Sequence, residues 1–221
     1  MKTRLHNARH GFSLVDLLVI VAVILVVGFA ILHVLSQAHH SPRKISCTSN
    51  LKQVGLAFRS WAYDNDEKFP MWASLTNSGI METVASGNVA AIFQIMSNEL
   101  NTPKILFCPS DKKRTQATSF DKSGVPTLSN ANVSYFIGMD ARDILPNSFL
   151  SGDDNFLVDG VPIKPGIQTI ATNTLVTWSE LRHEKQGNIG LADGSVQGFS
   201  SIALKAALKT TGLATNRLAM P

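Results

Sequence analysis

The longest hydrophobic segment of the chain runs from Leu17 to Leu32, and no residue in it has a polar side chain. Extended back to Phe12, it includes only Ser13 and Asp16 as polar residues, and as a helix it is about 32 Å long, the thickness of a bilayer core. In lipid the backbone N–H and C=O groups must pair within the segment, so we predict a membrane-spanning helix. A carboxylate inside a bilayer costs about 2.5–3.5 kcal/mol, which makes Asp16 a candidate functional residue.

A second pattern follows in Ile45–Tyr63, where apolar residues recur at helical spacing and polar residues fill the other positions. The apolar positions are Leu51, Val54, Phe58 and Trp61, and the polar ones are Lys52, Gln53, Arg59 and Ser60. This pattern predicts an amphipathic helix that packs on a sheet. Pro42 lacks an N–H, so we predict that the helix is kinked or interrupted there.

The remainder of the chain predicts short elements. We expect a helix over Val89–Met96 capped by Asn88, a helix over Ser201–Leu208, a long loop over Asp140–Gly160, and strands over Lys104–Asp111, Val133–Ile137, Thr169–Ala171 and Thr174–Trp178. Asp193-Gly194 stands between two further strand patterns and predicts a hairpin with a type I′ turn. The predicted fold class is α+β, with one long N-terminal helix packed on an antiparallel sheet.

Composition narrows the choice of function. The chain has 221 residues and a net charge of +4 that is spread out, so it lacks the concentrated basic face of a nucleic-acid-binding protein, and we expect no nucleic-acid partner. Cys47 and Cys108 have neither zinc-site nor Cys-x-x-Cys spacing. If the domain lies outside the cytoplasm we expect one disulfide, and two buried free thiols are the alternative.

Catalytic and cofactor motifs are weak in this sequence. His183 and Asp193 could be combined with Ser179 or Ser195 as a triad, but the sequence has no nucleophile-elbow pattern and a tight turn already explains Asp193. We expect His183 to hydrogen-bond a neighbouring strand or turn. No glycine-rich phosphate loop and no metal-ligand spacing is present, so we predict no enzyme activity, no cofactor and no metal.

Arg9–Ile20 resembles the class III signal of type IV pilins and type II secretion pseudopilins. In that family a basic leader ends in glycine, and a prepilin peptidase cleaves after this glycine and methylates the new N-terminus. An acidic residue further along then meets the ammonium group of a neighbouring subunit. The resemblance implies that Gly11 ends the leader, Phe12 is the methylated N-terminus and Asp16 is the acidic partner. The family usually has Glu at this place, and Asp is one methylene shorter.

Three further fragments resemble a pilin-like subfamily of planctomycete- and verrucomicrobium-type bacteria. They are Ser46–Ala57, Phe107–Asp111, and the spacing of His183, nine residues and Asp193-Gly194. This resemblance implies a pilin-like fold and supports pairing of Cys47 with Cys108.

The combined expectation is a leader at 1–11, a transmembrane half-helix at 12–38, an amphipathic half-helix at 39–64 and an extracytoplasmic domain at 65–221. The N-terminus is expected on the cytoplasmic side of the inner membrane. The basic residues before the span favour this orientation only weakly, because Arg43 and Lys44 follow the span, and the resemblance of the leader decides it. The expected partners are the membrane, a prepilin peptidase and other pilin or pseudopilin subunits. Alternatives are a single-span anchor that never polymerises, an anchored hydrolase, and a secretory signal cleaved after Ser36-Gln37-Ala38.

Overall fold

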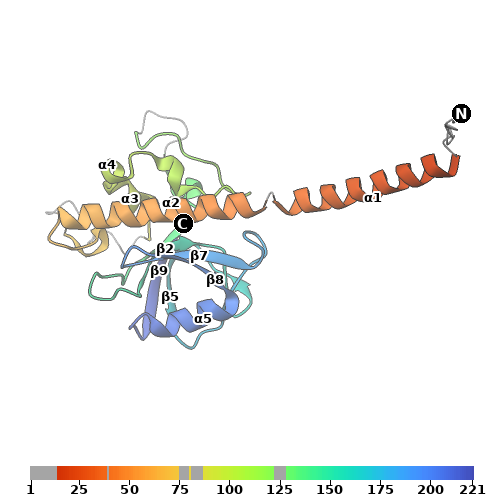
Figure 1. The fold of residues 1–221 in the computed structure, drawn as a ribbon. Helices are drawn as coiled ribbons and strands as arrows, with labels where there is room; N and C mark the ends of the chain where they lie inside the picture. Colours follow the sequence, from red (N-terminus) through yellow and green to blue (C-terminus); the bar gives the residue numbers. More distant parts are fainter. Residues whose placement is uncertain (1–13, 39, 75–79, 81–86, 122–127) are drawn as a thin grey trace, which may run out of the picture. The chain divides into compact units, whose positions relative to one another are not determined.

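The computed structural model describes residues 14–38, 40–74, 80, 87–121 and 128–221. The chain divides into two compact units, Met1–Pro42 and Arg43–Pro221, and each is described by itself (Figure 1). The predicted cleavage residues Gly11 and Phe12 lie outside the described residues.

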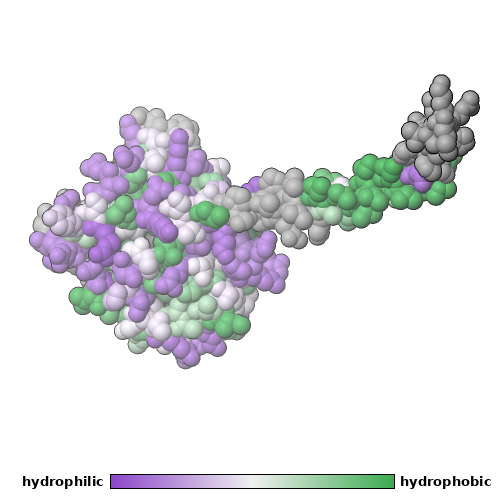
Figure 2. All heavy atoms as spheres, viewed as in Figure 1, coloured by the Kyte–Doolittle hydropathy of each residue, from purple (hydrophilic) through white to green (hydrophobic). Residues whose placement is uncertain are grey.

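The first unit contains helix α1, Leu14–Ala38, as the apolar pattern predicts. Its segment Leu14–Leu32 is long and apolar enough to cross a membrane, and none of its side chains is buried within the protein. Figure 2 shows the segment Leu14–Leu32 as a nearly continuous hydrophobic surface. An apolar surface of this extent is stable in lipid or against other apolar helices rather than in water.

Helix α2, His40–Tyr63, packs on the sheet of the second unit, and its predicted apolar stripe is confirmed. Leu51, Val54, Phe58 and Trp61 are all buried, whereas the polar positions between them are exposed. As predicted, the N-terminal helix is divided near Pro42: α1 ends at Ala38 and α2 begins at His40. Pro42 is the third residue of α2, within the first turn, where no helical partner exists for its missing N–H.

The other elements of the second unit are short. Its helices are η1 (Pro70–Trp72), α3 (Val89–Ile95), α4 (Ser97–Leu100), η4 (Pro103–Leu106), η5 (Asn130–Asn132) and α5 (Ser201–Thr210). Its strands are β1 (Tyr135–Gly138), β2 (Phe149–Asp153), β3 (Phe156–Val158), β4 (Val161–Pro162), β5 (Gly166–Ala171), β6 (Val176–Trp178), β7 (Gln186–Leu191), β8 (Val196–Ser200) and β9 (Thr215–Met220). The predicted cap of α3 is confirmed, because the Asn88 side chain accepts a hydrogen bond from the Ala91 N–H at 3.1 Å.

The strands form two antiparallel sheets, which confirms the α+β class. Six strands pair in the order β5-β9-β1-β2-β7-β8, and three pair in the order β4-β3-β6. Successive residues of a strand point to opposite faces, so β1 contributes Ile137 to the hydrophobic cluster under α2 and α3, and Phe136 to the cluster under α5. The large sheet therefore separates two cores.

Two predicted elements are wrong. The segment Lys104–Asp111 is not a strand, because Pro103 starts the 3₁₀ helix η4 and Thr102 Oγ1 accepts from the Lys104 N–H at 3.4 Å. The predicted loop Asp140–Gly160 contains β2 and β3, joined by a short polar connection. The two polar residues of that connection are buried: Asp154 belongs to the ion cluster described below, and Asn155 Nδ2 donates to the Ser179 carbonyl oxygen at 3.4 Å.

The predicted hairpin between β7 and β8 is confirmed, but its turn type is wrong. A type I′ turn has positive φ at both central residues, whereas within Leu191–Ser195 only Gly194 has positive φ, at 87°. The Gly194 N–H donates to Leu191 O at 3.0 Å, and the Leu191 N–H donates to Ser195 O at 2.8 Å. Asp193 instead accepts from the Ser195 N–H at 2.8 Å, which fixes its carboxylate inside the turn.

Candidate functional site

Asp16 lies in the first turn of α1, and its side chain is exposed. A carboxylate in this turn interacts favourably with the N–H end of the helix dipole. It is the one acidic residue of α1, whose other exposed side chains down to Leu32 are almost all apolar. The structure therefore places one negative charge at the start of a long apolar surface.

The predicted disulfide is present between Cys47 on α2 and Cys108, which follows η4. Both cysteines are completely buried, and their Cα atoms lie 5.2 Å apart. Together with Leu51 and Tyr135 they form a small hydrophobic cluster between the helix and β1. The disulfide thus joins α2 covalently to the segment that follows η4, beside β1.

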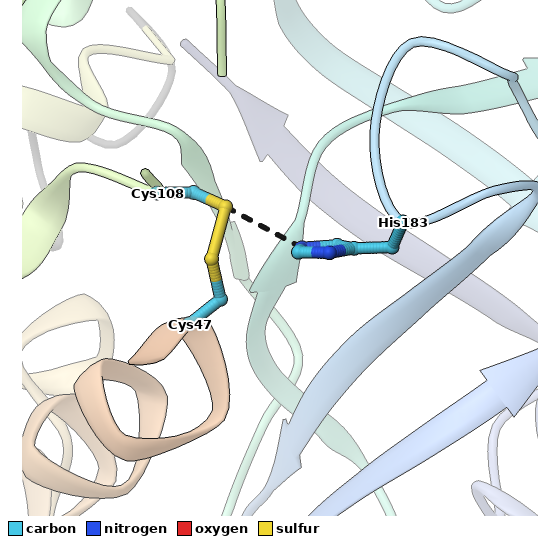
Figure 3. Close-up of side chains that lie close together, drawn as sticks. All are labelled: Cys47, Cys108 and His183. Atoms are coloured by element: carbon cyan, nitrogen blue, oxygen red, sulfur yellow. Dashed lines mark hydrogen bonds between the residues drawn. A yellow bond between two sulfur atoms is a disulfide. The ribbon is translucent and has the colours of Figure 1, made fainter. Parts of the chain in front are cut away.

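His183 brings its ring to this disulfide, as Figure 3 shows. Its Nε2 atom is 3.4 Å from Cys108 Sγ and 3.5 Å from Asp153 Oδ2. The predicted contact with a neighbouring strand is formed with the carboxylate that ends β2. Asp153 is itself completely buried, and its Oδ2 accepts from the backbone N–H and Nδ2 of Asn188 at 2.8 and 3.0 Å.

Asp193 and Gly194 lie at the other end of β7. A six-residue strand spans about 20 Å, so β7 holds Asp193 far from the His183 ring. None of the described contacts of Asp193 involves His183. The two residues therefore do not form a catalytic pair.

Strand β7 lies along α2, and successive contacts between them are separated by similar distances along the helix and along the strand. Three hydrogen bonds join the two elements: Lys44 to Gln186, Thr48 to Asn188, and Arg59 to the carbonyl oxygen of Ala192. Between the first and last of these pairs the helix rises about 22 Å and the strand advances about 20 Å. The stretch from Gln186 to Ala192 thus has about the same length as the part of α2 that it contacts.

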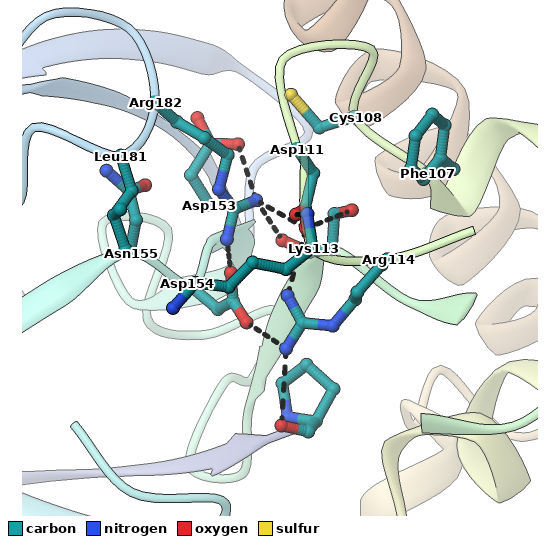
Figure 4. Close-up of polar contacts among 12 residues, drawn as sticks. Phe107, Cys108, Asp111, Lys113, Arg114, Asp153, Asp154, Asn155, Leu181 and Arg182 are labelled. Carbon is teal, nitrogen blue, oxygen red and sulfur yellow. Dashed lines mark hydrogen bonds and ion pairs between the residues drawn. The ribbon is translucent and has the colours of Figure 1, made fainter. Parts of the chain in front are cut away.

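A buried ion cluster adjoins the disulfide (Figure 4). Its members are the carboxylates Asp111, Asp153 and Asp154 and the guanidinium groups of Arg114 and Arg182. Arg114 bridges two of the carboxylates, at 3.0 Å from Asp111 Oδ2 and 2.6 Å from Asp154 Oδ2. Arg182 pairs with Asp154 and donates to the Ser134 carbonyl oxygen at 2.9 Å.

Burial and ion pairing shift the pKa of Asp111 and of Arg182 in opposite directions. Burial alone would raise the pKa of Asp111, but Arg182, the Lys113 N–H, Arg114 and Ser134 together hold that pKa below its ordinary value. Burial lowers the pKa of Arg182, although Asp153 and Asp111 oppose the shift. Asp111 and Arg182 thus each depend on their partners to offset the effect of burial.

A cavity of about 300 Å³ lies beside the ion cluster. Asp111 and Asp154 line its polar wall, while Phe156, Ile163 and Met220 line its apolar wall. Both carboxylates are already paired with arginine. The cavity thus lacks, among the described residues that line it, a free carboxylate pair of the kind used in acid–base catalysis.

The sequence did not predict this ion cluster. A weak signal was present, since Asp153-Asp154 is flanked by the apolar fragments Phe149-Leu150 and Phe156-Leu157, a pattern that suits two strands and a buried turn. Searches against protein-family models, curated proteins and solved structures return no match for this chain.

Proposed function

We propose that this protein is a prepilin-like structural subunit that is cleaved after Gly11, methylated at Phe12 and assembled into a type IV pilus or a type II secretion pseudopilus-like fibre. The observation that carries the proposal is helix α1, with an exposed apolar surface and its one acid, Asp16, in the first turn. The Gly-Phe junction stands four residues before that acid in the sequence.

The proposed mechanism is assembly rather than catalysis. Before processing, α1 holds the subunit in the bilayer, where the Asp16 carboxylate is costly. Cleavage creates an ammonium group on Phe12, and in a fibre the Asp16 carboxylate of one subunit pairs with the ammonium of a neighbour. In a low-dielectric helix bundle such a pair fixes the axial register, because any other register leaves a buried charge unpaired.

A second surface supports the proposal. Ile45, Leu56 and Tyr63 are 65%, 69% and 84% exposed and lie within about 20° of one another around α2, on the side opposite its buried stripe. Exposed polar residues such as Lys52 and Arg59 lie between these three side chains, so the outer apolar stripe of α2 is a row of single apolar side chains and not a continuous patch. We infer that this stripe meets neighbouring subunits.

Mass spectrometry of the mature chain tests the processing step. The expected mass begins at Phe12 and includes one methyl group, and a Gly11→Lys variant is expected to keep its leader. A mature chain that retains Met1, or one that begins at His39, would overturn the proposal in favour of a plain anchor or a cleaved secretory signal.

Assembly is tested separately, by shearing fibres from the cells that produce the protein and measuring the subunit in that fraction. Asp16→Asn and Leu56→Lys are expected to be processed normally and lost from the sheared fraction. Ile202→Lys is the matched control, since Ile202 is an 86% exposed apolar residue on α5. Normal processing without any sheared fraction from the wild-type chain would favour the non-polymerising anchor.

A further inference from the structure

The position of the His183 ring is not explained by a role in a fibre. The Sγ atoms of Cys47 and Cys108 and the Nε2 atom of His183 all lie within 4.8 Å of one another. Among the described residues this is the one group of three such ligand atoms. Both cysteines are completely buried and the His183 side chain is 1% exposed.

The backbone that carries this ring is strained. His183, Glu184 and Lys185 have φ angles of 51°, 54° and 61°, three successive non-glycine residues in the left-handed region. Residues with a Cβ atom rarely adopt this conformation, and three in succession are unusual. Strain of this kind persists where surrounding structure imposes it and is concentrated at functional sites.

The spacing suits a tetrahedral metal ion. A zinc ion with Zn–S bonds of about 2.3 Å and Zn–N bonds of about 2.0 Å has neighbouring S and N ligands about 3.5 Å apart. The observed distance from His183 Nε2 to Cys108 Sγ is 3.4 Å. The sulfur atoms of Cys47 and Cys108 are bonded to each other here, so the ion requires the reduced form, in which they can separate to about 3.8 Å.

Asp153 lies beside this group without being one of its three members. Its Oδ2 is 3.5 Å from His183 Nε2 and accepts from the backbone N–H and Nδ2 of Asn188 at 2.8 and 3.0 Å. Two thiolates match the charge of a divalent ion, and the fourth position of the tetrahedron would be left to water. The ligands stand far apart in the sequence, which is why no zinc spacing is visible there.

We propose that the dithiol form of this protein binds one thiophilic divalent ion of the zinc type through Cys47, Cys108 and His183. A phosphine reductant produces this form: the S–S bond takes two electrons from phosphorus and two protons from water, and the phosphine leaves as its oxide. Binding then releases the two thiol protons, because the thiolate is the ligand.

The test uses the full chain in detergent micelles, reduced with a phosphine without oxygen and titrated with Co²⁺ as a spectroscopic substitute for zinc. One equivalent is expected to give thiolate-to-cobalt charge-transfer bands and the strong visible bands of a tetrahedral site, which Zn²⁺ then removes. The oxidised protein is the matched control and is expected to give neither. Absence of these bands from the folded, reduced protein would overturn the proposal.

One variant separates this site from simple chelation by a dithiol. His183→Gln is expected to weaken Co²⁺ affinity at least tenfold. Equal affinity of wild type and His183→Gln would refute the assignment. If reduction unfolds the domain, one equivalent of metal is expected to restore its near-ultraviolet circular dichroism, and failure to do so also counts against the site.

Discussion

Replacing both cysteines by alanine is expected to lower the free energy of unfolding of the second unit by about 4 kcal/mol. The disulfide joins Cys47 to Cys108 across a sequence separation of 61. In the chain-entropy model, a closed loop of this length removes about 14 cal/mol/K from the unfolded chain, or about 4 kcal/mol at 25 °C. Since domains are typically stable by about 5–15 kcal/mol, this loss is a large part of the total.

Tryptophan fluorescence during urea unfolding measures this loss in the full chain held in detergent micelles. The three tryptophans of the chain, Trp61, Trp72 and Trp178, all belong to the second unit, so the signal is not affected by α1. Trp61 and Trp178 are buried and become exposed on unfolding. The free energies of wild type and variants are compared by linear extrapolation to water.

The single variants provide the control. Either Cys47→Ala or Cys108→Ala removes the whole bond, so each is expected to lose about as much stability as the double variant. The losses are therefore strongly non-additive. A loss of less than about 1 kcal/mol in the double variant, or single losses that add up to it, would refute the reasoning that the bond acts through loop closure.

Three further predictions follow from the ion cluster and the hairpin. Arg182→Met is expected to lower the free energy of unfolding by about 3–5 kcal/mol, because it leaves buried carboxylates unpaired. Lys185→Met, at an exposed ion pair, is expected to change it little, and equal effects of the two variants in urea unfolding would contradict this. The folded-state pKa of Asp111 is lowered from 3.8, so the contribution of this carboxylate to stability is complete above pH 3.8 and is lost as the pH falls through the lower folded value. Wild type is therefore expected to lose more stability in this pH window than Asp111→Asn. Parallel pH profiles of the two proteins would argue against this. Gly194→Ala is expected to lower the free energy of unfolding by about 1–2 kcal/mol, because φ is 87° and an added Cβ would lie 3.2 Å from Arg59 Cδ. Gly190→Ala serves as the control in the same thermal unfolding experiment, because its Cβ would make only ordinary contacts.

The sequence was sufficient to predict those features that depend on interactions between residues close together in the chain. The apolar stripe of α2 and the Asn88 cap of α3 both depend on residues within one or two helical turns. The hairpin at Asp193-Gly194 was also predictable, although its turn type was not. That detail depends on the Asp193 carboxylate bonding the Ser195 N–H, which competes with the expected turn.

The ion cluster could not be predicted in this way. Asp153 and Asp154 resemble loop residues when only their neighbours are considered, because isolated buried carboxylates are unfavourable. Their burial is possible only because Arg114 and Arg182, from two distant segments, reach them in the folded chain. For the same reason the contact of His183 with the disulfide was missed, since it depends on where β7 is placed against α2.

The two faces of α2 separate the stability of the domain from its proposed assembly. One face is fixed to the sheet along the length of β7, from the Lys44–Gln186 contact to the Arg59–Ala192 contact, and the other carries an exposed apolar stripe. Cys47 is the first buried residue of α2 after the junction of the two units at Pro42. In the proposed fibre, a pulling force on a subunit passes from α1 into α2 at this junction, where it would peel the helix from the sheet. The disulfide lies about one helical turn after the first of these contacts, so it bears the force with a covalent bond before the hydrogen bonds further along α2 are loaded.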